Sequence, residues 1–114
     1  MKKRISLSQL AQFDVNQKII QELADFESRA ILFSIKTKAK LAEDISYECK
    51  IPISSVYKKL RDLQYLALIF VERRDLSERG RRMKFYKSRI SEAEIRITKN
   101  IPELILIPNK KGKH

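Results

Sequence analysis

The apolar residues of this chain change their spacing near residue 66. Before that point they recur at intervals of three and four residues, as Val56, Leu60 and Leu63 do. After it, in Ala67–Val71, residues that favour strands follow one another. One face of a helix repeats about every 3.6 residues, and one face of a strand repeats about every two. The sequence therefore predicts an α+β fold with its helices first and its strands second.

The helical part divides into four segments. The first begins at Val15, and the second follows it with an apolar side supplied by Phe26, Ala30 and Phe33, together with Ile31, Ile35 or both. The third is expected over Lys38–Glu48, capped by the hydroxyl of Thr37. The fourth is expected over Ser55–Tyr65, capped by Ser54, because Pro52 disfavours helix at the residue before it. Leu41, Ala42 and Ile45 of the third segment and the stripe of the fourth would face inward.

Two pairs of strands follow the helices. Ala67–Val71 and Met83–Ile90 predict a hairpin whose long basic loop spans Arg73–Arg82. Glu94–Thr98 and Leu104–Ile107 predict a second pair, with the turn at residues 99–102. Leu104–Ile107 is apolar on both faces, and such a strand needs cover on both sides. This strand is expected either to close the sheet or to form a homodimer interface.

The length of 114 residues favours one domain. We expect a flexible basic segment over residues 1–14 and the main domain over residues 15–92. A C-terminal β extension over residues 93–109 belongs to that domain or to a dimer interface, and residues 110–114 form a disordered basic tail. Candidates for the homodimer interface are Ile19, Ile20, Leu23, Leu104 and Leu106, for which a place in the core is the alternative.

Positive charge is concentrated in the middle of the chain. The whole chain has 25 Lys or Arg and 14 Asp or Glu, a net charge of +11. Residues 36–89 hold fifteen basic and seven acidic side chains, a net of +8, whereas residues 1–35 and 90–114 carry only +1 and +2. A basic block between nearly neutral flanks is typical of nucleic-acid-binding proteins.

Other classes of function are disfavoured by the residues that the chain lacks. Its single cysteine, Cys49, and its single histidine, His114, provide neither a zinc site nor a nucleophile with an adjacent base. We therefore expect no enzyme activity, no metal and no cofactor. No apolar run approaches the roughly 20 residues that span a bilayer, and one cysteine suits a reducing compartment. The expectation is a cytoplasmic protein without a membrane partner.

Three or four helices followed by a basic hairpin are the layout of a winged helix-turn-helix with, here, a C-terminal β-strand extension. In such proteins one helix enters the major groove of DNA and the hairpin, or wing, contacts its flank. The predicted recognition-helix residues are Ser54, Ser55, Tyr57, Lys58 and Arg61, although Tyr57 equally suits a half-buried place in the core. The predicted wing residues are Arg73, Arg74, Arg79, Arg81, Arg82 and Lys84. The predicted function is a transcription regulator that binds double-stranded DNA; the alternative is a winged helix that binds RNA or a protein partner.

The same residues resemble a known family. Residues 17–35 are similar to the opening of ArsR-type winged helix-turn-helix regulators, and Leu41–Ser46 followed by Ile51–Leu60 is similar to the helix-turn-helix of archaeal members. The resemblance implies a dimeric DNA-binding regulator, with Ser54, Ser55, Tyr57 and Lys58 on the recognition helix and residues 79–84 in the wing. Many members have glycine where this chain has Lys50 and Ala67. Since a left-handed conformation is unfavourable for lysine, we expect a more open turn at Lys50. Strands also replace the family's usual C-terminal dimerisation helix.

Overall fold

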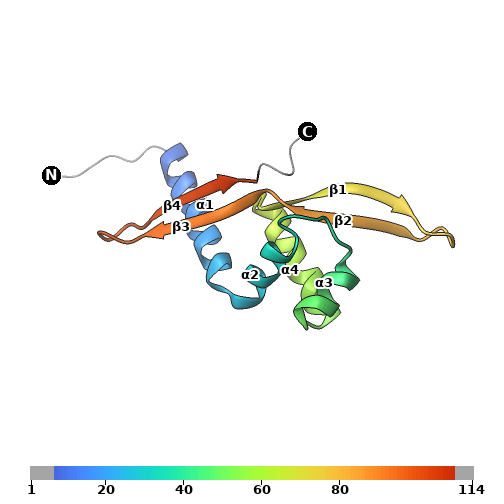
Figure 1. The fold of residues 1–114 in the computed structure, drawn as a ribbon. Helices are drawn as coiled ribbons and strands as arrows, with labels where there is room; N and C mark the ends of the chain where they lie inside the picture. The colour runs from blue at the N-terminus through green and yellow to red at the C-terminus, as the bar shows by residue number, and fades with distance from the viewer. Residues whose placement is uncertain (1–6, 110–114) are drawn as a thin grey trace.

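The computed structural model describes residues 7–109, which form an α+β fold of four helices followed by four strands (Figure 1). The helices are α1 (Leu7–Ala24), α2 (Phe26–Ser34), α3 (Ala42–Cys49) and α4 (Ile53–Tyr65). The strands are β1 (Ile69–Leu76), β2 (Arg82–Ser88), β3 (Ile90–Arg96) and β4 (Glu103–Pro108). The predicted order of helices and strands is confirmed. None of the helices within residues 7–109 is long and apolar enough to cross a membrane.

The strands form two antiparallel hairpins, β1–β2 and β3–β4, called here the first and second hairpins. Only Arg89 separates β2 from β3, so these two strands make one long bent ribbon. The two hairpins extend in opposite directions, and α2, α3 and α4 lie on one side of the ribbon (Figure 1). The molecule is therefore elongated, with extents of 65 × 28 × 24 Å.

The core lies between the helices and the middle of this ribbon. The predicted stripe of Val56, Leu60 and Leu63 on α4 is fully buried, as are Ala42 and Ile45 of α3. Leu68 and Ile69, at the start of the first hairpin, complete the core from the strand side. Burial of these aliphatic side chains is the main source of stability, at roughly 25 cal/mol for each Å² of apolar surface removed from water.

The apolar face predicted for α2 is wrong for Phe26 and Phe33 and is confirmed for Ile31 and Ile35. Phe26 is 73% exposed and Phe33 is 41% exposed, whereas Ile31, Leu32 and Ile35 are completely buried. The inward stripe begins with Ser28, which is also completely buried, because its hydroxyl donates a hydrogen bond to Glu22 at 2.5 Å. A prediction that counted only apolar residues left out this satisfied serine and placed the stripe one face away.

The third helix begins later than predicted, at Ala42 instead of Lys38, and Thr37 caps nothing. The connector before it pairs with the edge of β2: Lys40 and Tyr86 exchange backbone hydrogen bonds of 3.0 and 2.9 Å, and the Ser88 N–H donates to the Ile35 carbonyl. These backbone bonds hold the connector extended. Whether this segment pairs with the edge of β2 or begins the helix therefore depends on Tyr86 and Ser88, which lie far away in the sequence.

The fourth helix begins earlier than predicted. Its N-cap position is Pro52, the first helical residue is Ile53, and no side chain caps it. Proline suits this position because its φ of −53° is fixed near the helical value and it has no N–H to satisfy. Ser54 is therefore the second residue of the helix and not its cap.

Strand β1 and helix α1 are longer than predicted, whereas β2 is one residue shorter than the predicted Met83–Ile90. β1 continues through Arg73 and Arg74 to Leu76, and the turn is only residues 77–81, with Gly80 at a left-handed φ of 79°. Arg73 and Arg74 expose their side chains while their backbones pair with β2. The basic stretch Arg73–Arg82, predicted to be a loop, is therefore partly strand. Helix α1 begins at Leu7, which replaces the flexible segment predicted to reach residue 14. The first six residues and the predicted tail at 110–114 lie outside the described residues.

The expected open turn at Lys50 is also wrong. Lys50 has φ 57° and ψ 46°, and the Ile51 N–H donates to the Ser46 carbonyl at 3.1 Å, which closes the end of α3 tightly. Ala67 has φ 62°, and the Leu68 N–H donates to the Leu63 carbonyl at 2.9 Å after α4. Both positions keep the left-handed geometry without glycine, at about 1 kcal/mol or more each.

Candidate nucleic-acid interface

Helix α4 presents one polar face to solvent. Ser54, Lys58 and Arg61 are exposed, Ser55 is half-buried, and Tyr57 is 41% exposed. This arrangement follows from the buried stripe on the opposite side of the same helix. The five predicted recognition-helix residues therefore lie on the exposed side or at its edge.

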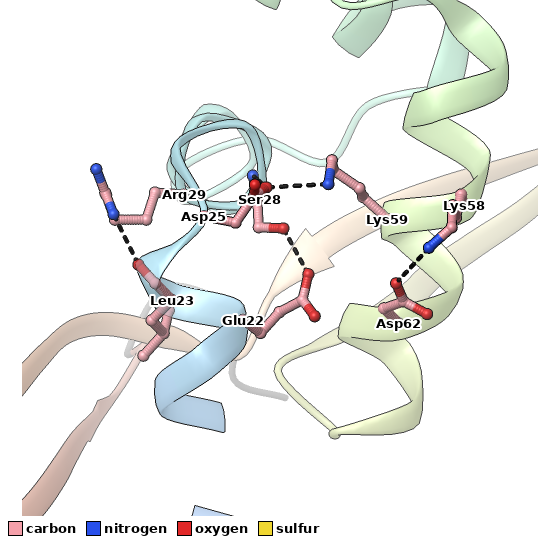
Figure 2. Close-up of polar contacts among 8 residues, drawn as sticks. All are labelled: Glu22, Leu23, Asp25, Ser28, Arg29, Lys58, Lys59 and Asp62. Carbon is pink, nitrogen blue, oxygen red and sulfur yellow. Dashed lines mark hydrogen bonds and ion pairs between the residues drawn. The ribbon is translucent and has the colours of Figure 1, made fainter. Parts of the chain in front are cut away.

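One of these cations is partly neutralised by its own helix. Lys58 lies 3.6 Å from the carboxylate of Asp62, one turn further along α4 (Figure 2). Arg61, in contrast, forms no ion pair with any residue in the described range 7–109. Of the cations on this face, Arg61 is the one with its full charge available to a ligand.

The first hairpin changes character as it leaves the helices. Register and strand alternation place Val71, Arg74 and Leu76 of β1 on one face with Tyr86, Lys84 and Arg82 of β2. Near the helices this face is apolar, since Tyr86 is buried and Val71 packs against the core. Further out it carries three cations. The inner face of the first hairpin therefore becomes basic where the helices no longer cover it.

A cleft of about 320 Å³ lies between α4, the start of α3 and this hairpin. Arg61, Tyr57 and Gln64 of α4 line one wall, and the opposite wall belongs to the end of the hairpin. The structure brings together five of the predicted site residues here: Tyr57, Arg61, Arg81, Arg82 and Lys84. A concave surface with cations on both walls suits a polyanion.

The remaining predicted residues lie elsewhere. Arg73 is on the other face of the first hairpin, where its guanidinium stacks 3.8 Å from the centre of the Phe85 ring and lies 3.5 Å from Asp75. Arg74 and Arg79 are exposed outside the cleft, on β1 and in the turn. Ser54, Ser55 and Lys58 lie on α4 but do not line the cleft.

An ion pair crosses the mouth of the cleft. Arg81, at the end of the hairpin turn, donates a hydrogen bond to the carboxylate of Glu43 in the first turn of α3. Arg82 and Lys84 have no acidic partner among the described residues. Glu43 therefore ties the hairpin to the helices and neutralises one of its cations, a role that the sequence did not reveal.

Tyr86 forms the inner end of the cleft. Burial raises the pKa of its phenol above the ordinary value, the nearby Tyr57 raises that pKa further, and Arg74 opposes the shift. The phenol therefore stays protonated to a higher pH than that of an exposed tyrosine.

A polar cluster that sequence reasoning missed holds α4 against the first two helices (Figure 2). Asp25 accepts hydrogen bonds from the Ser28 N–H at 2.9 Å and from the Lys59 ammonium at 3.0 Å, so it caps α2 and binds α4 with the same oxygen. Lys59 holds the pKa of Asp25 below its ordinary value, and Asp25 raises the pKa of Lys59. Arg29 closes the same junction by donating to the Leu23 carbonyl at 2.8 Å. The cluster fixes the orientation of α4.

The dimer candidates separate into two groups. Ile19 and Leu23 are each 6% exposed and belong to the core, so they are not accessible to a partner. Ile20, Leu104 and Leu106 are half-buried, and the two leucines pack against the core cluster from β4. Cys49 is half-buried with its thiol 3.6 Å from the Ala30 carbonyl.

No family model matches the chain, and no curated protein matches it significantly.

Proposed function

We propose that this chain is a winged helix-turn-helix protein that binds double-stranded DNA and regulates transcription, as members of the ArsR-type family do. In this proposal α3 and α4 are the helix-turn-helix, α4 enters the major groove, and the first hairpin is the wing. The proposal is supported by the resemblance of residues 17–35 to the opening of that family, and of Leu41–Ser46 followed by Ile51–Leu60 to the helix-turn-helix of its archaeal members. The tight left-handed turn at Lys50, between α3 and α4, also supports it.

One observation carries the proposal: unpaired cations from α4 and from the first hairpin line the same cleft. Arg61 lies on one wall, and Arg82 and Lys84 lie on the other, with no acidic partner within residues 7–109. Cations that were needed only for solubility would be spread over the surface or paired. Cations that converge on an uncovered concave face suit the phosphates of a duplex.

The roles of the individual residues follow from their positions. Arg61 projects from the exposed face of α4 and is the proposed reader of base edges, since arginine donates in a fork to guanine. Arg82 and Lys84 would hold phosphates on the flank, and the exposed Arg79 at the turn would reach furthest along the duplex. Lys59 is excluded from this role because Asp25 binds it.

The test measures fluorescence anisotropy with labelled duplex DNA, single-stranded DNA and RNA at two salt concentrations, together with selection from random duplexes. Duplex preference and an enriched motif are expected. Arg61→Ala should weaken binding and change the ranking of selected sites, whereas Arg96→Ala, the same change on the exposed end of β3, should do neither. Preference for RNA would favour the alternative RNA-binding function. Weak binding that depends on charge alone would refute a sequence-specific regulator.

A further inference from the structure

Strand β4 has an open edge. It pairs with β3 alone, in a sheet of two strands, and no other strand among the described residues lies beside it. Its outer backbone N–H and C=O groups therefore lack ladder partners within residues 7–109. Such an edge is a template for pairing with another strand. A two-stranded hairpin is also only marginally stable in water, so it gains from additional strands.

The middle of β4 carries nothing that protects this edge, because Leu104–Ile107 contains four aliphatic residues and no charge. Protective residues stand only at the two ends of the strand, where Glu103 is charged and Pro108 lacks an N–H. Strand edges that stay single in proteins usually carry charged residues, above all lysine. The other strand of the hairpin is protected in that way, since β3 carries Glu92, Glu94 and Arg96. A β3–β3 pairing would bring like charges together, whereas an antiparallel β4–β4 pairing centred on Leu104–Ile107 places Glu103 opposite Pro108 and not opposite its own copy.

Both faces of β4 are apolar over Leu104–Ile107, and all four of these side chains are half-buried. Leu104 and Leu106 pack against the core cluster. Ile105 and Ile107 alternate with them, so they lie on the face that bears Glu94 and Glu92, opposite them in the register. Towards the hairpin turn the sheet is left bare: Ile97 is 75% exposed and Ile101 is 60% exposed.

The distribution of charge decides which partner fits. Residues 36–89 carry a net charge of +8, and two copies of that surface repel each other. Residues 90–109 hold three acidic and two basic side chains, a net of −1. This is the end of the molecule furthest from the turn of the basic hairpin (Figure 1). A second copy can approach here with the least repulsion, and its identical uncharged stretch Leu104–Ile107 matches the same stretch of the open edge.

We propose that β4 pairs antiparallel with β4 of a second copy, which joins the two second hairpins into one four-stranded sheet. A two-fold axis satisfies both edges at once and closes the assembly at a dimer. The ladder alone is short, so the bare isoleucines beside it supply the additional apolar contact that a stable interface requires. Pairing through β4 requires no DNA, so its test is independent of the proposed function.

The experiment is sedimentation velocity on the full chain over a wide concentration range without DNA. We expect a concentration-dependent dimer. Ile105→Lys places two lysines at the new strand pair and should raise the dimer dissociation constant about 100-fold or more. Thr98→Lys adds the same charge at an exposed position beyond β3 and should leave it unchanged. A wild-type chain that remains monomeric, or an Ile105→Lys variant as dimeric as Thr98→Lys, overturns the proposal.

Two further measurements keep the test decisive if the lysine variant fails to fold. Ile105→Thr keeps a strand-forming residue and removes apolar contact, so it should fold by circular dichroism and weaken the dimer by roughly tenfold. Hydrogen exchange of the amides in residues 104–107 should slow as the concentration of wild-type protein rises. Exchange that is independent of concentration would refute pairing through this edge.

Discussion

The two hairpins of this molecule have the same backbone arrangement but differ in the charge of the parts that extend beyond the helices. Each is a two-stranded antiparallel ribbon with one irregular register step, and each leaves the helices in an opposite direction (Figure 1). Residues 69–88 hold seven basic and three acidic side chains, a net of +4. Residues 90–108 hold two basic and three acidic, a net of −1. The first hairpin turns basic at its open end, and the second stays apolar.

This difference separates two kinds of recognition. A basic surface attracts phosphates and repels a second copy of itself. An uncharged apolar edge attracts a second copy and has nothing to offer a phosphate. Because β2 and β3 are one continuous ribbon, the two proposed surfaces are held by a single element at a fixed separation. A regulator that reads two half-sites requires such a fixed separation.

The largest effect is expected when the charge at the open end of the first hairpin is reversed. Arg82→Glu with Lys84→Glu places two acids on the wall of the cleft, and duplex affinity should fall about 100-fold or more. The slope of log K against log salt should also decrease by about two, because two phosphate contacts are lost. Fluorescence anisotropy at several salt concentrations measures both quantities.

The matched control makes the same change on the other hairpin. Arg96→Glu with Lys99→Glu alters the net charge of the chain equally, and both residues are exposed. It should lower duplex affinity by much less. Equal losses in the two variants would mean that only overall charge matters, and the proposed interface would be wrong.

A second prediction concerns the helical body that holds both hairpins. Asp25→Ala removes the cap of α2 and the partner of Lys59, and it should lower the free energy of unfolding by about 1–2 kcal/mol. Asp25→Asn retains a good capping side chain and loses only the ion pair, so it should cost less than about 1 kcal/mol. Urea unfolding at neutral pH measures both.

The pH dependence of the same pair has a defined sign. The pKa of Asp25 is lowered in the folded chain, so its contribution is present above the unfolded pKa and disappears as the pH falls through the folded value. The pKa of Lys59 is raised, so its contribution is present below its ordinary pKa and is lost at strongly alkaline pH. The stability difference between wild type and Asp25→Asn should therefore vanish in acid. A difference that persists there would show that the charge of Asp25 is not its cause.

Local patterns were sufficient for much of the fold. The stripe of α4, the inward positions of Ala42 and Ile45 in α3 and the helix-before-strand order depend on local spacing, and the structure confirms them. Leu41, also predicted to face inward, is the half-buried N-cap residue of α3. Arg61, Arg82 and Lys84 were identified because basic residues cluster in this part of the sequence. Their convergence on one cleft depends on the register of β1 with β2, which no local pattern contains.

Three of the failures share a cause, since each depends on a partner in another element. Thr37 lost its capping role because the connector pairs with Tyr86, 49 residues later. The sequence predicts that Phe26 faces inward, because it does not show that Ser28 can be buried instead. Ser28 is buried through its hydrogen bond to Glu22 of the preceding helix. The sequence does not show that Glu43 binds the hairpin, because its partner Arg81 is 38 residues away. These contacts exist only after the chain has folded.

Glu43 allows a finer test of the first hairpin. Glu43→Gln removes the acid from the mouth of the cleft and frees Arg81, so duplex affinity should rise a few-fold and the salt slope should steepen by about one. Stability should change by less than about 1 kcal/mol, because both partners are exposed. Glu48→Gln, also on α3 but paired with Lys40 away from the cleft, is the control and should leave the affinity nearly unchanged. Unchanged or lower affinity for Glu43→Gln would mean that holding the hairpin in place matters more than the freed charge.

The smallest expected effect concerns backbone strain, which also distinguishes the two ends of the molecule. Lys50 and Ala67 are the positive-φ residues other than glycine within 7–109, and they precede α4 and β1 in the basic half. Ala67 is exposed, so Ala67→Gly removes a strained Cβ with little loss of packing. Relief of about 1–2 kcal/mol is opposed by the larger entropy of glycine in the unfolded chain, about 0.5–1 kcal/mol. A net gain of about 0.5 kcal/mol, or roughly 2–4 °C in Tm, is expected in a thermal melt. Ala11→Gly, at an exposed position within α1, should instead destabilise the protein, since glycine is unfavourable in a helix.

Because glycine keeps the left-handed geometry, the direction of β1 should be unchanged, and duplex affinity should be equal in Ala67→Gly and wild type. Loss of affinity in a stabilised variant would mean that the methyl group of Ala67, and not only its backbone conformation, sets the position of the basic hairpin.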